Sequence, residues 1–81
     1  MRLMPRYFID LHDGGELLRD RDGYELPGLE AARAQAVRIM TRIAQGFTDA
    51  PERQDYVAAV RDAEGAVRWR IRMSLDADPA E

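Results

Sequence analysis

Residues 67–75 alternate apolar and polar side chains at every step, and this run constrains the fold more than any other part of the chain. A period of two is typical of a β-strand with one buried face and one solvent-facing side. The apolar positions, centred on Trp69 and Ile71, are expected to face a core, whereas Arg68, Arg70 and Arg72 are expected to line the opposite side. The run therefore predicts a sheet with an arginine-bearing outer face.

Size and composition exclude several classes of protein. A chain of 81 residues can form one small domain, which buries roughly 60% of the surface of its unfolded chain. The sequence has no cysteine, so disulfides and thiolate metal sites cannot support this core, and oligomerisation is an alternative source of stability.

The net charge of −3 argues against a general polyanion binder. No apolar run approaches the ~20 residues of a membrane span, and the first residues lack the apolar stretch of a secretory signal, so we expect a cytoplasmic location.

The N-terminal third is predicted to form a hairpin with a short extension. Strands at residues 6–12 and 16–19 are joined through the turn Asp13-Gly14-Gly15. A second turn, at residues 20–23, leads into an extended segment at residues 24–26.

A second hairpin is predicted from strands at residues 55–62 and 66–75, with Gly65 supplying the positive φ of the turn. A loop of two or of four residues leads to the same assignment of faces. No acidic side chain of this hairpin is expected to neutralise the arginines of the outer face. The core face holds Tyr56, Ala58 and Val60 with Trp69 and Ile71, and the outer face holds Val57, Ala59 and Arg61 with the arginines.

Between the hairpins, the spacing of apolar residues changes to three and four, which predicts an amphipathic helix over residues 29–45. Gly28 is an acceptable N-cap, and Gly46 stands where a left-handed residue often ends a helix. Several alanines on the apolar side allow the helix to lie close to a sheet. A polar loop containing Pro51 is expected over residues 48–54.

These elements predict an α+β fold with a single antiparallel four-stranded sheet and one amphipathic helix on one face, in the order ββαββ. Residues 1–81 are expected to form one domain, with a core over residues 5–75 and frayed ends at residues 1–4 and 76–81. The predicted core residues are Tyr7, Ile9, Leu11, Leu29, Ala32, Ala36, Ile39, Ile43, Val60, Trp69, Ile71 and Met73.

Several short segments form a recognisable series: Met4-Pro5-Arg6-Tyr7-Phe8-Ile9-Asp10, His12-Asp13-Gly14, Asp20, Gly23-Tyr24-Glu25-Leu26-Pro27, Leu29-Glu30-Ala31-Ala32-Arg33 and Val60-Arg61-Asp62-Ala63-Glu64-Gly65. This series resembles a family of short bacterial proteins classed as a domain of unknown function. Members often carry Asp as the helix cap where this chain has Gly28. The resemblance implies the same architecture and no assigned activity. More distantly, the order of hairpin, Leu-Pro-Gly, Ala-rich helix and strand resembles the antitoxin half of HicA/HicB toxin–antitoxin systems.

The residues that usually carry catalysis or bind metals do not form a convincing group. His12 is the single histidine, and we expect it to face solvent or a cross-strand partner, because no second histidine or cysteine can complete a metal site. The run Asp20-Arg21-Asp22-Gly23 departs from a calcium loop at the sixth and twelfth positions and is better explained as a turn with Asp side chains bound to local amides. The sequence therefore predicts no enzyme, no cofactor and no metal site.

The outer face of the sheet is the predicted interaction surface, and it comprises Arg61, Arg68, Arg70, Arg72 and Phe8. Three interpretations remain open: a solvated face with arginines paired to Asp10 or Glu16, a protein interface, or a nucleic-acid surface. The leading hypothesis is a small cytoplasmic interaction or structural module that forms a homodimer or binds another protein. The alternative is a nucleic-acid-binding or antitoxin-like regulator that uses the arginine face.

Overall fold

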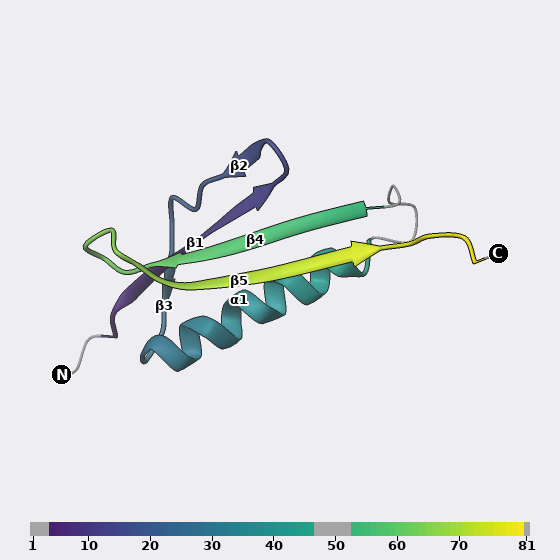
Figure 1. Ribbon diagram of the computed structural model, residues 1–81. Coiled ribbons are helices and arrows are strands. Elements are labelled where there is room, and N and C mark those ends of the chain that lie inside the picture. Colours follow the sequence, from purple (N-terminus) through teal and green to yellow (C-terminus); the bar gives the residue numbers. More distant parts are fainter. Residues whose placement is uncertain (1–3, 47–52, 81) are drawn as a thin grey trace.

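The computed structural model describes residues 4–46 and 53–80 and places one helix beside one sheet in this part of the chain (Figure 1). The predicted frayed residues 1–3 and most of the predicted loop 48–54 lie outside the described residues. The fold is α+β with a single antiparallel sheet, as the sequence predicts. The elements are β1 (Arg6–Asp13), β2 (Glu16–Leu18), β3 (Tyr24–Glu25), α1 (Leu29–Ala44), β4 (Arg53–Arg61) and β5 (Val67–Asp76).

The sheet has the order β2-β1-β4-β5, and every strand pair is antiparallel. β3 pairs with Arg6 and Tyr7 at the start of β1, whereas β2 pairs with residues 11–13 at its end. The described residues thus form five strands instead of the predicted four. β2 has only three residues and leaves the start of β1 without a neighbouring strand on that side. Tyr24 and Glu25 pair with Tyr7 and Arg6 there, and so form the additional strand.

The register through the centre of the sheet confirms the predicted faces. Val60 lies between Ile9 on β1 and Trp69 on β5. One row further along, Ala58 lies between Leu11 and Ile71. The strands of the second hairpin differ slightly from the prediction. β4 is one residue longer and begins at Arg53, and β5 is shifted by one residue, so that Asp76, predicted to fray, belongs to it.

α1 packs on the face of the sheet that carries these apolar rows. Its buried residues are Ala32, Ala36 and Met40, and the two alanines have no exposed surface, so the helix approaches the sheet closely. Ile43, predicted as core, lies outside the buried cluster and lines a surface hollow. The cluster consists of Tyr7, Ile9, Ala32, Ala36, Met40, Ala58 and Val60, with Leu11, Leu29, Ile39, Trp69, Ile71 and Met73 among the partly buried side chains packed against it.

The helix ends differ in part from the expectation. Gly28 precedes the first helical residue, and its carbonyl accepts the Ala32 N–H at 3.0 Å without a side-chain cap. Gly46 does not adopt the predicted left-handed conformation. Its N–H donates to the Ile43 carbonyl at 3.0 Å, so a tighter turn satisfies the C-terminal backbone.

Trp69 joins β5 to the first turn of α1. Its indole Nε1–H donates to the Leu29 carbonyl at 3.0 Å, and the Arg33 guanidinium lies 5.7 Å from its ring centroid. The residue is only partly buried, but it combines apolar packing with a polar bond between layers.

We expect Trp69→Ala to lower the free energy of unfolding by roughly 2–4 kcal/mol, somewhat less than a fully buried tryptophan would. Trp69→Phe keeps most of the packing and removes the indole donor, so its cost should be about 1 kcal/mol. Urea unfolding followed by circular dichroism measures both. If the alanine variant were as stable as wild type, Trp69 would not join the two layers.

Candidate functional site

The five residues of the predicted interaction surface have different environments in the structure. Phe8 and Arg61 lie in a partly buried cluster. Arg68, Arg70 and Arg72 are exposed, and of these three Arg68 bonds to a turn. All belong to β1, β4 or β5, and all lie on the face of the sheet opposite α1, which we call the outer face. The outer face is therefore not a uniform row of arginines.

Arg61 forms an ion pair with Asp10 across the β1–β4 pairing. Its Nε donates to Asp10 Oδ2 at 2.6 Å and its Nη2 to Asp10 Oδ1 at 3.2 Å, and Nη2 also donates to the Asp20 carbonyl at 3.2 Å. The guanidinium lies 4.9 Å from the Phe8 ring centroid. Asp10 is only 5% exposed, so this pair stabilises the sheet and leaves little of Arg61 for a ligand. Arg61 thus makes the pairing with Asp10 that one of the three interpretations offered.

Asp20 connects this pair to the free part of the β1 edge. Its carboxylate accepts the Ile9 N–H at 3.0 Å and the N–H groups of Asp22 and Gly23 at 3.2 and 3.0 Å. Its own N–H donates to Asp10 Oδ1 at 2.9 Å. The predicted binding of Asp side chains to local amides is confirmed, but the bond to Ile9 was missed, because it joins residues eleven positions apart.

Gly23 is required where this turn passes the Phe8 ring. Its φ is +77°, a conformation that other L-residues rarely adopt. A Cβ at this position would lie 2.9 Å from Phe8 Cε2 and 3.0 Å from Arg6 Cγ. The turn can therefore lie close to the sheet only because this residue has no side chain.

The pKa of Asp10 lies below its ordinary value of 3.8. Burial raises the pKa, but the hydrogen bonds from Arg61 and from the Asp20 N–H, together with the Arg61 charge, outweigh this effect. A carboxylate whose pKa is lower in the folded state contributes stability above the unfolded pKa and loses that contribution as the pH falls through the folded pKa. Ionised Asp10 therefore stabilises the fold at neutral pH.

We expect Asp10→Asn to lower the free energy of unfolding at pH 7 by roughly 2–4 kcal/mol, because a largely buried guanidinium loses its counterion. The difference between wild type and variant should shrink as the pH falls below about 4, because Asp10 of the unfolded chain is protonated first, and it should vanish once the pH has fallen through the lower pKa of the folded protein. Urea titrations at pH 7 and pH 3 measure both differences. A difference that is equal at the two pH values would contradict an ionised Asp10.

In a double-mutant cycle, Asp10→Ala with Arg61→Ala should lower the free energy of unfolding by less than the sum of the two single changes.

Arg68 bonds to the turn that joins β4 and β5. Its Nη1 donates to Asp62 Oδ2 at 3.2 Å, and Asp62 Oδ1 accepts the N–H groups of Glu64 and Ala66 at 3.0 and 2.9 Å. The bond from Ala66, together with the others, lowers the pKa of Asp62. The expectation that no acidic side chain of this hairpin neutralises the arginines is therefore wrong. Gly65, with a φ of +89°, makes the turn as predicted.

Arg70 and Arg72 are exposed on the outer face, as Arg68 is, but they differ from Arg68 in their contacts. They lie opposite Ala59 and Val57 on β4, whose small side chains provide no acceptor. Neither guanidinium forms a hydrogen bond or an ion pair with any residue in the described parts of the chain. These two residues are the part of the predicted surface that is free to bind.

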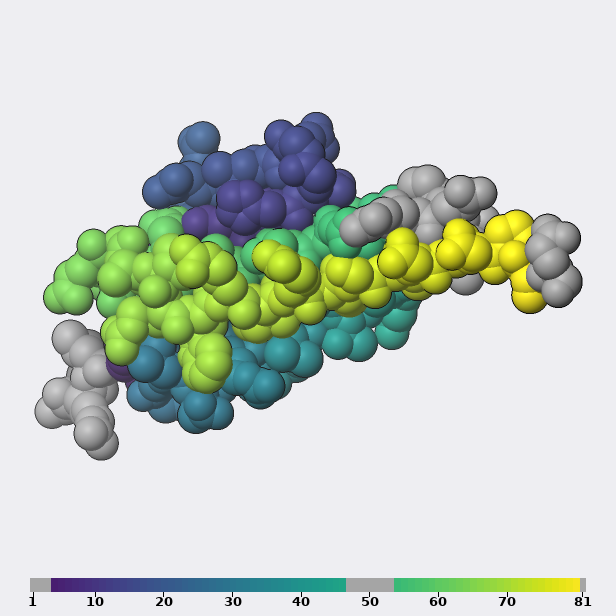
Figure 2. All heavy atoms as spheres, viewed as in Figure 1, coloured from purple at the N-terminus to yellow at the C-terminus, as the bar shows by residue number. Residues whose placement is uncertain are grey.

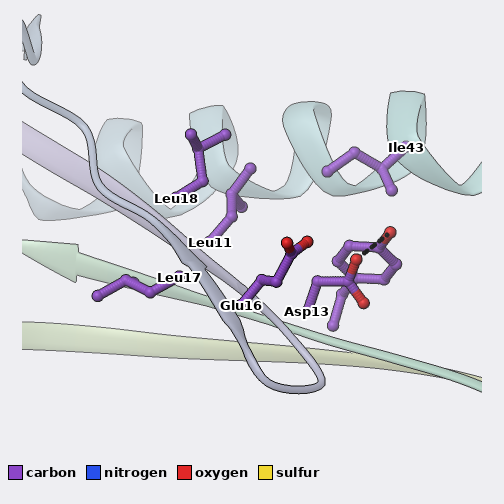
Figure 3. Close-up of a pocket in the computed structure, with 7 residues that line it drawn as sticks. Leu11, Asp13, Glu16, Leu17, Leu18 and Ile43 are labelled. Carbon is purple, nitrogen blue, oxygen red and sulfur yellow. Dashed lines mark hydrogen bonds between the residues drawn. The ribbon is translucent and has the colours of Figure 1, made fainter.

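The sequence did not indicate a hollow of about 580 Å³ between the β1–β2 hairpin and the C-terminal half of α1 (Figure 3). It forms because α1 packs mainly against β4 and β5. Leu18 is 68% exposed at its rim, and the Tyr56 hydroxyl donates to Asp13 Oδ2 at 3.2 Å. Burial, followed by the Asp13 bond, raises the pKa of Tyr56. The lining is Leu11, Asp13, Glu16, Leu17, Leu18, Ile43 and Tyr56.

β5 forms one edge of the sheet. It has ten residues and pairs with β4 on one side, and no other described strand lies beside it. Figure 2 shows β5 running uncovered along the front of the molecule, with α1 below and the β1–β2 hairpin above. Its free backbone groups are thus open to another chain.

Side chains that could bind a metal ion do not gather in the described residues. Within residues 4–46 and 53–80 there is no group of three His, Cys, Asp or Glu side chains that can hold a metal ion. His12 lies exposed on β1, opposite Val57 and Leu17. α1, the one helix described, is too short and too polar to cross a membrane.

The sheet, the helix and the series of motifs define a small α+β domain, and a family model identifies it. The model of the family described as Domain of unknown function (DUF6894) matches residues 6–74, which is most of the chain. The chain belongs to this family, whose description assigns no activity. No curated protein and no solved structure matches the chain.

Proposed function

We propose that this chain is a small, non-catalytic interaction module of the cytoplasm that acts as a homodimer. The observation that carries the proposal is the edge position of β5, beside which no described strand lies except β4. A long edge strand presents N–H and C=O groups that favour pairing with another strand. β5 has no proline, and Gly65, the nearest glycine, precedes it in the turn.

Two further features support self-association. One sixteen-residue helix covers only part of its face of the sheet, so Leu18, which shares that face with Leu11, remains exposed on β2. A domain of this size without cysteine gains much of its stability from packing, and a second subunit extends the packed layers. The outer face, by contrast, has few groups for catalysis.

We expect the full chain to elute as a dimer at ~100 μM, with dilution shifting it toward monomer. The physical reason is that edge pairing satisfies backbone groups and buries apolar surface at once. Size-exclusion chromatography with light scattering measures the mass. A monomer at every concentration tested would contradict the proposal and favour a different protein as partner.

A second candidate function rests on Arg70 and Arg72. Two exposed guanidinium groups on an open sheet face can bind phosphates of single-stranded nucleic acid, as an antitoxin-like regulator would. Phe8 gives little support as a stacking platform, because Arg61 covers its ring and Gly23 packs beside it. The net charge of −3 also opposes binding. We therefore rank this function second.

We expect wild type to bind mixed single-stranded RNA or DNA weakly or not at all at 150 mM salt, as measured by fluorescence anisotropy. If wild type binds at low salt, the Arg70→Ser/Arg72→Ser variant should bind less. The slope of log K against log salt should fall by about 1.4 units, at ~0.7 per lost phosphate contact. Sub-micromolar binding at physiological salt that this folded variant abolishes would favour the nucleic-acid function.

A further inference from the structure

We propose that β5 pairs antiparallel with β5 of a second copy, with the two-fold axis at Met73, so that Met73 lies opposite the partner's Met73. This inference deepens the proposed homodimer, because it specifies the edge and the register. It places Arg70 opposite the partner's Asp76 and thereby assigns a partner to a guanidinium that is otherwise exposed.

Symmetry limits the registers that are possible. When two identical edge strands pair antiparallel about an axis perpendicular to the sheet, each residue lies opposite one on the same face. The axis must therefore pass beside one residue, which then lies opposite its own copy in the partner. The choice of this residue fixes which residues lie opposite one another along the rest of the strand. For β5 the choice is among the central residues 71–74, because axes closer to either end leave little strand to pair.

Charge distinguishes these four registers. An axis at Ile71 places Arg70 opposite the partner's Arg72, and an axis at Arg72 places that arginine opposite its own copy, so both bring like charges together. An axis at Met73 places Arg72 opposite the partner's Ser74 and Arg70 opposite the partner's Asp76. These are a polar pair and an opposite-charge pair, and the symmetry produces each of them twice.

The length of the paired segment separates the Met73 register from the one centred on Ser74. With the axis at Met73, the paired segment comprises residues 70–76 of each β5 strand. With the axis at Ser74, only residues 72–76 of each strand overlap within β5, although Arg72 would then face the partner's Asp76. The Met73 register therefore pairs more backbone N–H and C=O groups than the Ser74 register does. It also brings opposite charges together, so both criteria favour it.

The helix-side face of the same register is apolar. Ile71 lies opposite the partner's Leu75, and Met73 meets its own copy. Leu75 is 37% exposed at the end of β5 and would gain cover from this contact. The axis is perpendicular to the sheet, so both helices lie on the same face and form a continuous second layer.

Asp76 is able to take this role whatever it contacts within its own chain. A carboxylate has two oxygens and accepts hydrogen bonds from more than one donor. The partner's Arg70 is therefore an additional donor to it, and no contact within the subunit has to break.

A cysteine scan tests the register directly, because the chain has no natural cysteine. Directly opposite Cα atoms in an antiparallel pair are about 4.5–5.5 Å apart, within the range that a disulfide spans. In the proposed register, Met73→Cys should form a disulfide-linked dimer under mild oxidation. Arg72→Cys and Ser74→Cys should not, because their copies are roughly 8 Å apart. Non-reducing gel electrophoresis and mass spectrometry report the product.

Exchange of charges tests the ion pair. Arg70→Asp and Asp76→Arg should each raise the dimer dissociation constant roughly tenfold, since each change introduces two like-charge contacts. The double variant Arg70→Asp/Asp76→Arg should restore most of the affinity. Arg38→Asp, on the exposed side of α1, is the matched control and should leave the affinity unchanged. Circular dichroism melting establishes that each variant is folded.

The outcomes separate this inference from the proposed function. A dimer that cross-links at residue 72 or 74 instead of 73, or whose charge variants are not restored in combination, would overturn the register and leave the homodimer in place. A monomer would overturn both. Loss of nucleic-acid binding without change of mass in Arg70→Asp would assign this arginine to the alternative function.

Discussion

The structure depends on one constraint: a single helix has to bury the apolar face of a sheet that is wider than the helix. α1 solves this problem mainly over β4 and β5, where Ala32 and Ala36 allow close approach to Ala58 and Val60. Trp69 ties the layers together through its bond to the Leu29 carbonyl. The part of this face that α1 leaves uncovered contains the hollow beside the β1–β2 hairpin and the exposed Leu18 of β2. The same arrangement leaves β5 as a long edge.

The outer face is organised by a different interaction, the ion pair of Asp10 and Arg61. A largely buried pair needs further hydrogen bonds to offset its desolvation, and here the Asp20 N–H and the Asp20 carbonyl supply them. Asp20 in turn accepts the Ile9 N–H in the gap between β2 and β3. Asp20 thus accepts a backbone N–H of β1 that no described strand pairs with, and it also holds the turn in place. Arg61, bonded to both Asp10 and Asp20, has a structural role. The cations left for binding are Arg70 and Arg72, which lie next to the β5 edge.

This division of the arginines bears on function. A row of four equivalent arginines would suit a phosphate backbone. Here Arg61 is held in a largely buried ion pair and Arg68 bonds to Asp62, and the other two lie on an edge strand, which suits a protein strand that brings its own acidic residue. β5 carries such a residue at its C-terminal end, Asp76, which the proposed register places opposite the partner's Arg70. Membership of the DUF6894 family is consistent with either role, because the family description assigns none.

The sequence by itself determined the elements, their faces and much of the core. Strict alternation at residues 67–75 and helical spacing at residues 29–45 are local patterns. Such patterns can be read from the sequence because they depend only on residues close together in the chain. Tertiary structure alone decided the third strand of the N-terminal region, the conformation of Gly46, the position of Ile43 at a hollow, and the use of each arginine. These depend on which backbone groups and carboxylates come within hydrogen-bond distance after folding. Asp10 and Arg61 are fifty-one residues apart, and no periodicity predicts that this arginine, and not Arg70, receives the buried partner.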